Sequence, residues 1–414
     1  MNVAYPGPWP VLNDYDALLM DVARRIQLSK TKHEVAETNF RALCQYVDRE
    51  GSPLENKVIE CYPSGSFATG TAIASRVAKD QHDVDVVMEL DVASNTAPSA
   101  ILSLLFKAIN GEEGSRYHGK VTQNSRCVTV EYDDGTTVDL MPIARIDGPE
   151  RAGNLFHHKA ETGESYHKRV NPWGFAKHFN DHVDFDPAFH DLFKGRRMLV
   201  EGKIVEKAET QPMPEHVPIE EKSARVVALQ LLKRNRDIVW RAPSRKGRKP
   251  PAIALSAMSL DAGPVHPSLL DEVIAIATYI RTRLLETNGP RGTVRVVNPA
   301  YPADEFTDRW PENKTAQDLY DGDLRRLIVD LYKLRNEDLS LAEQQEVLKR
   351  LFGETAASYA IVSKLEAQRH EMDANRMRLT NTGKVVGMAA PAVVAPSSTP
   401  AKAATREGGG ELSQ

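Results

Sequence analysis

Two short apolar runs that carry aspartates constrain the fold of this chain more than any other feature. They are Asp83-Val84-Asp85-Val86-Val87 and Val138-Asp139-Leu140. β-Branched residues favour a strand, and the side chains of a strand point alternately to its two faces. The first run therefore predicts a strand that turns both of its aspartates to one face and sends valines into a core.

The second run returns from a predicted hairpin. Residues 126–132 form one expected strand, Asp133-Asp134-Gly135 a tight turn, and residues 136–141 the returning strand, with Asp139 between apolar neighbours. Asp-Gly tolerates the positive φ that such turns need. If the returning strand pairs beside the first aspartate strand, three carboxylates converge on one face.

Three converging carboxylates predict a metal site. Like charges raise each other's pKa unless a cation neutralises them, and oxygen ligands suit Mg²⁺, which keeps water and substrate phosphates in its shell. Upstream, Gly65-Ser66 opens a segment that we expect to lead into a helix and to hold phosphate oxygens through its N–H groups and the Ser66 hydroxyl. The arrangement suits phosphoryl transfer with two metal ions. In the alternative interpretation, Asp83 and Asp85 lie on a solvated strand face.

Together these residues resemble the polymerase-β-like nucleotidyltransferase superfamily. The fuller pattern is similar to the bacterial CD-NTases, the cyclic-oligonucleotide synthases of CBASS anti-phage defence, and more distantly to oligoadenylate synthase and cyclic GMP-AMP synthase. The resemblance covers roughly residues 10–365. The segments that carry it are Gly65-Ser66-Phe67, Gly70-Thr71, Asp83-Val84-Asp85, the stretch from Gln230 to Asp237, and Asn298-Pro299.

The resemblance implies an α+β fold. We expect a polymerase-β-like nucleotidyltransferase core, with a mixed sheet flanked by helices, plus a helical C-terminal lobe, so that the protein is bilobed with a central nucleotide cleft. The expected division is residues 1–155 for the catalytic core with its N-terminal bracing helices, 156–375 for the helical lobe, and 376–414 for a disordered tail rich in Ala, Pro, Ser, Thr and Gly.

The resemblance also implies an activity, namely metal-dependent transfer that joins NTPs, ATP and/or GTP, into a cyclic di- or trinucleotide messenger for antiviral defence. Two Mg²⁺ ions, for which Mn²⁺ can substitute, would be held by Asp83, Asp85 and Asp139. Asp139 would bind the catalytic metal and accept the proton of the acceptor hydroxyl. Gly65, Ser66 and Lys233 would bind phosphates, although a solvated lysine is the alternative for Lys233. CBASS accessory proteins are expected to act on the C-terminal tail.

Some segments depart from the family pattern or leave alternatives open. Ala252-Ile253 stands where related enzymes place a hydroxyl or an aromatic residue, so no base-stacking residue is identified. Asn298 to Phe306 is expected to form a structural loop anchored by Phe306 and Trp310. The basic run Arg241–Lys249 is expected to be a solvated loop, with phosphate contact as the alternative. His178 and His182 have the spacing of a metal pair, but a surface position is favoured.

Composition excludes several classes of function. A net charge of −4 argues against a sequence-independent duplex binder, which usually has a basic footprint. The three cysteines are widely spaced, so we expect no zinc site and no zinc-bound DNA clamp. Their odd, sparse number favours the cytoplasm. The proline-rich first ten residues do not resemble a signal peptide, and no apolar run approaches the ~20 residues of a membrane span.

The sequence leaves two other functions open. One is a linear oligonucleotide synthase, of the 2′-5′ oligoadenylate or tRNA-end type, which a long basic surface would favour. The other is a non-catalytic nucleotide sensor, which the loss of a metal carboxylate would favour.

Beyond the site, periodicity predicts a mainly helical second half. The strands between Lys120 and Arg145 are expected to complete the sheet, because Asp147-Gly148-Pro149 breaks the pattern. The expected helices of the second half span residues 219–240, 252–258, 268–285, 316–336 and 341–375.

Overall fold

The computed structural model describes residues 13–74, 82–183, 187–201, 216–373, 377–379 and 385–387. The chain forms two compact units, residues 1–366 and 367–414. The second unit contains a small antiparallel pair, β10 (Met377–Leu379) and β11 (Val385–Gly387). Most of the predicted tail lies outside the described residues. All the other strands belong to the first unit.

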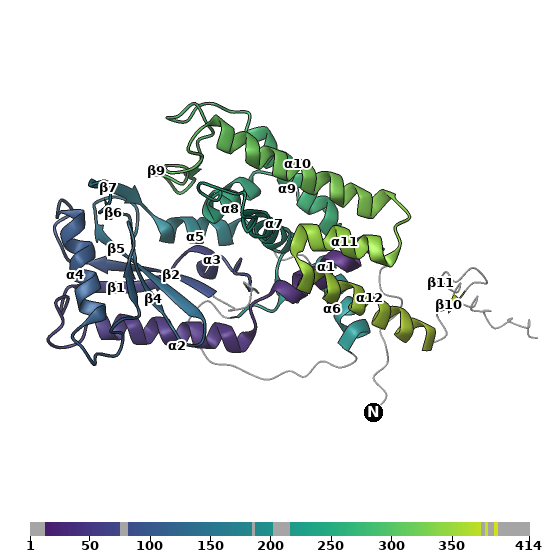
Figure 1. The fold of residues 1–414 in the computed structure, drawn as a ribbon, viewed down its shortest axis with the longest axis horizontal. Coiled ribbons are helices and arrows are strands. Elements are labelled where there is room, and N and C mark those ends of the chain that lie inside the picture. Colours follow the sequence, from purple (N-terminus) through teal and green to yellow (C-terminus); the bar gives the residue numbers. More distant parts are fainter. Residues whose placement is uncertain are drawn as a thin grey trace, which may run out of the picture. The chain divides into compact units, whose positions relative to one another are not determined.

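The first half of this first unit is mixed, and its second half is mainly helical (Figure 1). The strands are β1 (Val58–Pro63), β2 (His82–Leu90), β3 (Val121–Gln123), β4 (Val128–Glu131), β5 (Thr136–Arg145), β6 (Gly153–Lys159), β7 (Glu164–Val170), β8 (Val297–Asn298) and β9 (Tyr301–Glu305). The helices are α1 (Asp14–Ile26), α2 (Lys30–Val47), α3 (Gly65–Ala68), α4 (Pro98–Asn110), α5 (Pro172–Asp181), α6 (Pro187–Glu201), α7 (Ala224–Trp240), α8 (Ala252–Leu260), α9 (Leu269–Arg283), α10 (Lys314–Asn336), α11 (Leu341–Phe352) and α12 (Glu354–Asp373). The boundary between the two units falls within α12.

The sheet has seven strands in the path β1-β2-β5-β4-β3, with β6 paired to the end of β5 and β7 paired to β6. The central pair, β2 and β5, is parallel, and the other pairs are antiparallel. The sheet is therefore mixed, and the predicted α+β class is confirmed.

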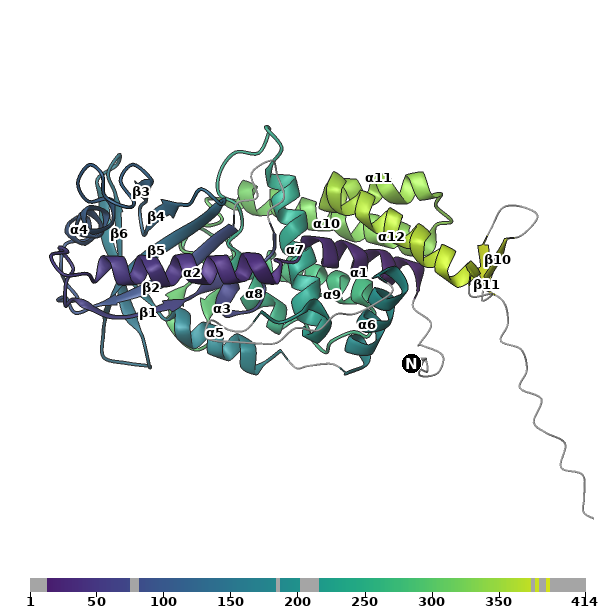
Figure 2. The ribbon, with the colours of Figure 1, turned by 90° about the horizontal axis from the view of Figure 1, so that it is seen from below.

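Period-two alternation separates the two faces of the central strands. On one face, Val84, Val86, Val138 and Leu140 are fully buried in a core shared with α2 and α4. Figure 2 shows α2 running across this part of the sheet. Because neighbouring residues point the opposite way, the aspartates between these valines and leucine face away from α2 and α4.

A second core holds the helical region together, and α7 lies at its centre. Every residue of α7 from Ala224 to Arg236 is buried, because α1, α8, α9 and α11 surround it. The helix begins at Ser223, whose Oγ accepts the Val226 N–H at 3.2 Å, the expected N-cap contact. A helix fixed on all sides is a rigid support for a side chain that must reach a functional site.

Most predicted elements are found, with three corrections. The strands do not end at Arg145, since β6 and β7 continue the sheet beyond the Asp147-Gly148-Pro149 turn. The helix expected over 341–375 is two helices, broken where Gly353 adopts φ 90°. Of the two N-terminal helices, α2 braces the sheet, but α1 buries its apolar face against the helical region instead. The predicted boundary at residue 155 falls inside β6, and the division into a core and a lobe remains a prediction.

Among the described residues, no helix combines the length and the apolar character that crossing a membrane requires.

A buried ion pair links α7 to α9. Arg225 Nε donates to Glu272 Oε1 at 2.6 Å, and its other nitrogens donate to the carbonyls of Ser259 and Gly263. Both side chains are almost fully buried. Removing one partner of such a pair leaves the other buried and uncompensated.

We predict that Arg225→Met lowers the free energy of unfolding by about 3–5 kcal/mol, because Glu272 keeps its charge in the core. The Arg225→Met/Glu272→Leu double variant should recover much of this loss. Arg281→Met, which breaks the half-exposed pair of α9 with Asp321, is the control and should cost about 1 kcal/mol or less. Urea unfolding measures all three, and equal losses for Arg225→Met and Arg281→Met would contradict the interpretation.

Candidate active site

The parallel register of β2 and β5 brings the three predicted aspartates together. Asp83 lies opposite Thr137, and Asp85 lies directly opposite Asp139. All three aspartates line one cleft of about 980 Å³. The sequence predicted that the two strands place these side chains on a common face, and the structure places them there.

Each outer carboxylate has a hydroxyl partner, and the middle one has none. The Thr137 hydroxyl donates to Asp83, and the Thr129 hydroxyl on β4 donates to Asp139. Within the described residues, the Asp85 carboxylate accepts no hydrogen bond. Burial raises the pKa of Asp85 to about 7, and the neighbouring Asp139 and Asp83 contribute to this rise. Burial also raises the pKa of Asp139, against the opposing effect of Thr129. The three carboxylates therefore carry an electrostatic cost that a cation would remove.

The donor atoms of this group suit a hard divalent cation, because all of them are carboxylate oxygens. As the side chains stand, the described part of the chain contains no group of three His, Cys, Asp or Glu side chains that forms a metal cage by itself. Mg²⁺ commonly completes its shell with water and substrate phosphate oxygens. The residues thus fit Mg²⁺ with a shell completed by water and by the phosphate oxygens of a ligand.

Gly65 lies directly against the Asp85 carboxylate. It adopts φ +57°, and a Cβ built on it would overlap Asp85 Oδ2 and lie 3.0 Å from Asp85 Cγ. The adjacent Ser64 N–H donates to the backbone carbonyl of Asp85 at 2.8 Å. The glycine is therefore required twice, for its left-handed backbone and for this close approach.

Ser66 follows in α3, a single turn, so the helix expected after the Gly-Ser pair is present but short. Its side chain lines the cleft, and within the described residues its hydroxyl has no hydrogen-bond partner. The loop behind it is tied down, since Thr69 Oγ1 donates to the Gly65 carbonyl at 3.0 Å. Ser66 thus presents a free donor from a fixed loop beside the carboxylates.

Lys233 reaches the same cleft from the centre of α7. It is 3% exposed, so the alternative of a solvated lysine is wrong. Its Nζ donates to Thr71 Oγ1 at 2.6 Å. Burial lowers the pKa of Lys233 to about 7, and the nearby Arg236 contributes to this fall. An ammonium that meets only a hydroxyl has spare capacity for an anion.

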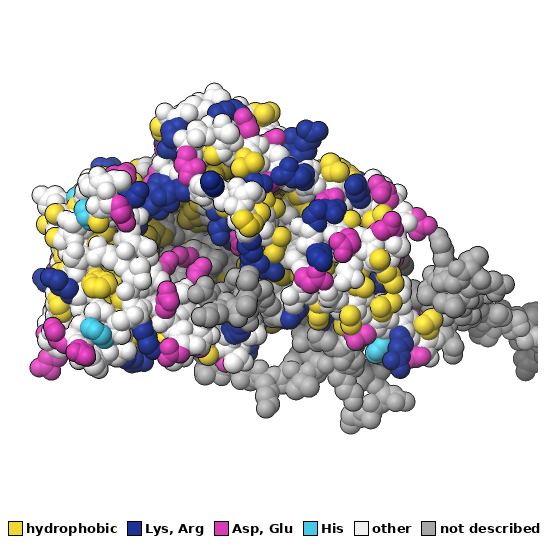
Figure 3. Space-filling view, viewed as in Figure 1, with side chains coloured by type: hydrophobic (Ala, Val, Ile, Leu, Met, Phe, Trp, Pro, Cys, Tyr) yellow, Lys and Arg dark blue, Asp and Glu magenta, His cyan; other side chains and the backbone are white. Residues whose placement is uncertain are grey.

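The wall of the cleft is strongly basic. Figure 3 shows a hollow between the sheet and the helical region with Lys and Arg side chains along its rim. Apart from the three strand aspartates, the acidic side chains in the lining are Asp237, Asp304 and Asp308. The basic ones are Arg126, Lys168, Lys233, Arg236, Arg241, Arg248, Lys249 and Arg309. This excess of cations favours a polyanionic ligand.

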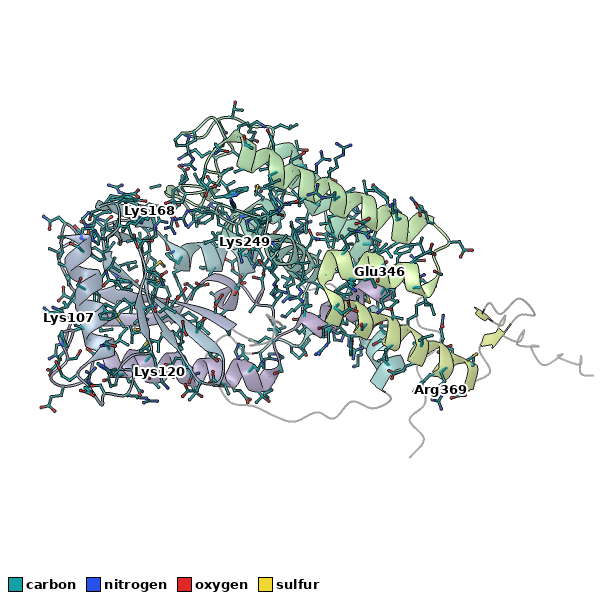
Figure 4. All side chains as sticks on the ribbon, viewed as in Figure 1. Lys107, Lys120, Lys168, Lys249, Glu346 and Arg369 are labelled. Atoms are coloured by element: carbon teal, nitrogen blue, oxygen red, sulfur yellow. The ribbon has the colours of Figure 1, made fainter. Side chains whose placement is uncertain are left out.

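The basic loop after α7 is exposed except at Arg245, so its interpretation as a solvated loop is confirmed, and the loop also forms part of this wall. Its Arg248 and Lys249 line the cleft. The loop is held in place by the Arg245–Asp323 ion pair and by the Arg248 N–H, which donates to Glu312 at 2.8 Å. Lys249 from this loop and Lys168 from β7, both labelled in Figure 4, come from the helical region and from the sheet.

Sequence reasoning missed Arg126, Lys168 and Asp308, which form one ion-paired group, and their neighbour Arg309. The Arg126 guanidinium pairs with Asp308, and Lys168 Nζ lies 3.2 Å from Asp304 and 3.8 Å from Asp308. The spacing of these residues in the sequence gave no signal, because they are far apart in the chain. Arg126 and Asp308, for example, are separated by 182 residues.

The remaining predicted features have structural roles. Asp304 accepts from the Asn171 N–H and from Asn298 Nδ2, and Phe306 and Trp310 are buried, so the expected structural loop is confirmed. His178 and His182 stack with ring centroids 4.0 Å apart and belong to no metal-binding group of described residues.

Comparison with known proteins agrees with this geometry. Residues 14–164 match the SMODS family, described as the Second Messenger Oligonucleotide or Dinucleotide Synthetase domain. Over 400 residues, the chain is 30% identical to the cyclic dinucleotide synthase CdnG of Bradyrhizobium diazoefficiens, and the match covers 96% of this chain and 94% of that protein. The structure of this CD-NTase in complex with GTP matches with a TM-score of 0.72 and 30% identity, over 85% of this chain and 98% of that one. The structure of Escherichia coli MS115-1 CdnC with ATP shares the fold, with a TM-score of 0.53 and 17% identity over 82% and 98% of the two chains.

The contact of Gly65 with Asp85 can be tested against Gly70 in the same loop. Both glycines have positive φ, but a Cβ on Gly70 would meet nothing within 4 Å. We predict that Gly70→Ala costs only the left-handed backbone strain, about 1–2 kcal/mol, whereas Gly65→Ala costs more. In an Asp85→Ala background most of that difference should disappear, as urea unfolding in a double-mutant cycle would show. Equal costs at both glycines in the native background would contradict the close approach.

Proposed function

This chain belongs to the CD-NTases, a family of nucleotidyltransferases that make cyclic oligonucleotides, and we propose that it joins NTPs into a cyclic di- or trinucleotide. The observation that carries the proposal is the in-register placement of Asp83, Asp85 and Asp139 in a cleft with a basic wall. Nucleotidyl transfer needs both features, because its substrates are triphosphates and its transition state gathers negative charge at one phosphorus.

In each step, the hydroxyl oxygen of an acceptor nucleotide forms a bond to the α-phosphorus of a donor NTP. The bond between that phosphorus and the bridging oxygen breaks, pyrophosphate leaves, and the hydroxyl proton passes to a base. Asp139 would be this base. Its position on the far side of Asp85 from Gly65 and its hydrogen bond from Thr129 support the role. Repetition within the linear product closes the ring.

The donor triphosphate has candidate ligands on the other side of Asp85. The Ser66 hydroxyl and the nearby backbone N–H groups would bind phosphate oxygens, and Lys233 would add a positive charge. Asp83, Asp85 and Asp139 would hold two Mg²⁺ ions, with Mn²⁺ as a substitute. When bound, these ions would neutralise the triphosphate and favour loss of the acceptor proton.

Substrate and biological context are further parts of the proposal. The relative with 30% identity is bound to GTP, which supports GTP, with ATP as the other candidate. A role in antiviral CBASS defence, with accessory proteins acting on the C-terminal tail, follows from the family alone. A cytoplasmic location is consistent with the three free cysteines.

We predict that the purified protein with four labelled NTPs and Mg²⁺ or Mn²⁺ gives a phosphatase-resistant product whose mass, by mass spectrometry, is that of a cyclic oligonucleotide. Asp83→Ala/Asp85→Ala should abolish the product without lowering the melting temperature, because the change removes two repelling charges. Glu112→Ala/Glu113→Ala, which removes two exposed acids, is the control with unchanged product.

Other outcomes would support other functions. Phosphatase-sensitive chains would indicate a linear synthase. NTP binding without release of pyrophosphate would indicate a nucleotide sensor. Full turnover in the double aspartate variant would refute the assignment of the carboxylates.

A further inference from the structure

One end of the cleft carries guanidinium groups without carboxylate partners. Arg126, Lys168, Arg248 and Arg309 lie in its lining, together with Asp304 and Asp308. Both of these carboxylates are already engaged, Asp308 by Arg126 and Lys168, and Asp304 by Lys168. Two positive charges of this group are therefore not compensated by the acids beside them.

The Arg126 guanidinium is already engaged in contacts within the protein. Besides Asp308, it donates to Tyr166 Oη at 2.9 Å and from Nε to His157 Nδ1 at 3.0 Å. Burial, together with Arg126 and Arg309, lowers the pKa of His157 to about 4, so this imidazole is neutral and adds no charge. Arg126 thus positions Asp308 and the loop beyond it rather than offering a free binding group.

Arg309 and Arg248 are different. Among the described residues, Arg309 has one hydrogen-bond partner, Ser125 Oγ at 3.0 Å, and no ion pair. The Arg248 side chain has no hydrogen bond or ion pair with any described residue, and only its backbone N–H is used. Burial lowers the pKa of Arg309, and the positive charges of Arg126 and Arg248 lower it further. Two neighbouring guanidinium groups in the cleft lining are thus without an ion-paired carboxylate among the described residues.

The strand order places these cations opposite the predicted donor site. Gly65 and Ser66 follow β1, the aspartates lie on β2 and β5, and Ser125 and Arg126 precede β4. Arg309 contacts Ser125 just before β4, and Lys233 contacts Thr71 in the segment that follows Ser66. Since the order across the sheet is β1-β2-β5-β4, these two cations lie on different sides of the carboxylates. β4 also carries Thr129, the partner of Asp139.

The reaction supplies the anion that this end of the cleft lacks. When two NTPs are joined, only the donor loses pyrophosphate, and the acceptor keeps its own 5′-triphosphate in the linear intermediate. We propose that Arg309 and Arg248 form a second triphosphate subsite, which binds the 5′-triphosphate of the acceptor nucleotide; this proposal rests on the function proposed above. Arginine suits this role, because its planar fork donates two parallel hydrogen bonds to phosphate oxygens.

The test separates donor from acceptor by using analogues that can play only one part. A 2′,3′-dideoxy-GTP has no nucleophilic hydroxyl and serves only as the donor. Guanosine α,β-methylene triphosphate keeps its hydroxyls but cannot donate, and GMP is an acceptor without a triphosphate. The matching adenosine compounds are run in parallel, and the rate of single-bond formation is measured at varied acceptor concentration.

For the native protein we expect the triphosphate acceptor to have a lower KM than the monophosphate. Arg309→Ala should raise the KM for the triphosphate acceptor about tenfold to a hundredfold, the usual loss for one charge-assisted phosphate contact. It should leave the KM for GMP and for the dideoxy donor within about twofold. Arg309→Lys should restore part of the effect, and Arg248→Ala, in an exposed loop, gives the same test without altering packing.

Arg295→Ala is the matched control, since this arginine lies outside the cleft lining and pairs with Glu305. It should change no KM. An equal rise for the triphosphate and monophosphate acceptors would overturn the proposal in favour of base or ribose contact. A rise in KM that is confined to the dideoxy donor would overturn the proposal, because it would show that these arginines bind the donor triphosphate. If the native protein forms no bond with any pair, the proposed function fails and this subsite fails with it.

Discussion

The parallel pairing of β2 with β5 is the constraint on which the rest of this site depends. It sets Asp85 beside Asp139 and leaves Asp83 two residues along the same strand, so three carboxylates occupy one face. A shift of one residue in either strand would send its aspartates into the core with α2 and α4 and its valines into the cleft. The buried valines and leucine on the opposite face make that shift very unfavourable. The hydrophobic core therefore holds the register that the carboxylates need.

Electrostatics then explain why the surroundings of the carboxylates are basic. The three carboxylates repel one another where water is partly excluded, and the protein does not neutralise them with ion pairs. Thr129 and Thr137 orient two of them through neutral hydroxyls, while Gly65 leaves room for the third. The cations stand further out, on α7, on the loop after it and beside β4. This separation leaves the carboxylates and the cations apart, as the proposed binding of metal ions by the acids and of phosphates by the bases requires.

The sequence predicted the part of the site that depends on local pattern. Alternation in the two aspartate strands was sufficient to place Asp83, Asp85 and Asp139 on one face, and the family pattern was sufficient to single out Lys233. The Arg126–Asp308 pair was not predictable in this way, because it joins segments that lie far apart in the chain and come together only in the folded structure, where β7 contacts β9. The same limit applies to the loop after α7. Its exposure was predicted from its basic composition, but its place beside the cleft depends on the distant Asp323 and Glu312, which hold it there.

The proposed mechanism depends on a division of roles within a two-metal centre. Asp139 would serve the acceptor side, while Asp83 and Asp85 would hold the metal ion that binds the donor triphosphate. This division is tested most directly in Asp139→Asn, by calorimetric affinity for a non-hydrolysable NTP with Mg²⁺ beside the single-turnover rate. We predict near-native affinity with bond formation slowed at least about a hundredfold, because only the transition state loses support. A collapse of affinity as large as that of the rate would make Asp139 a donor ligand. Unchanged affinity and rate would show that Asp139 takes no part in the chemistry.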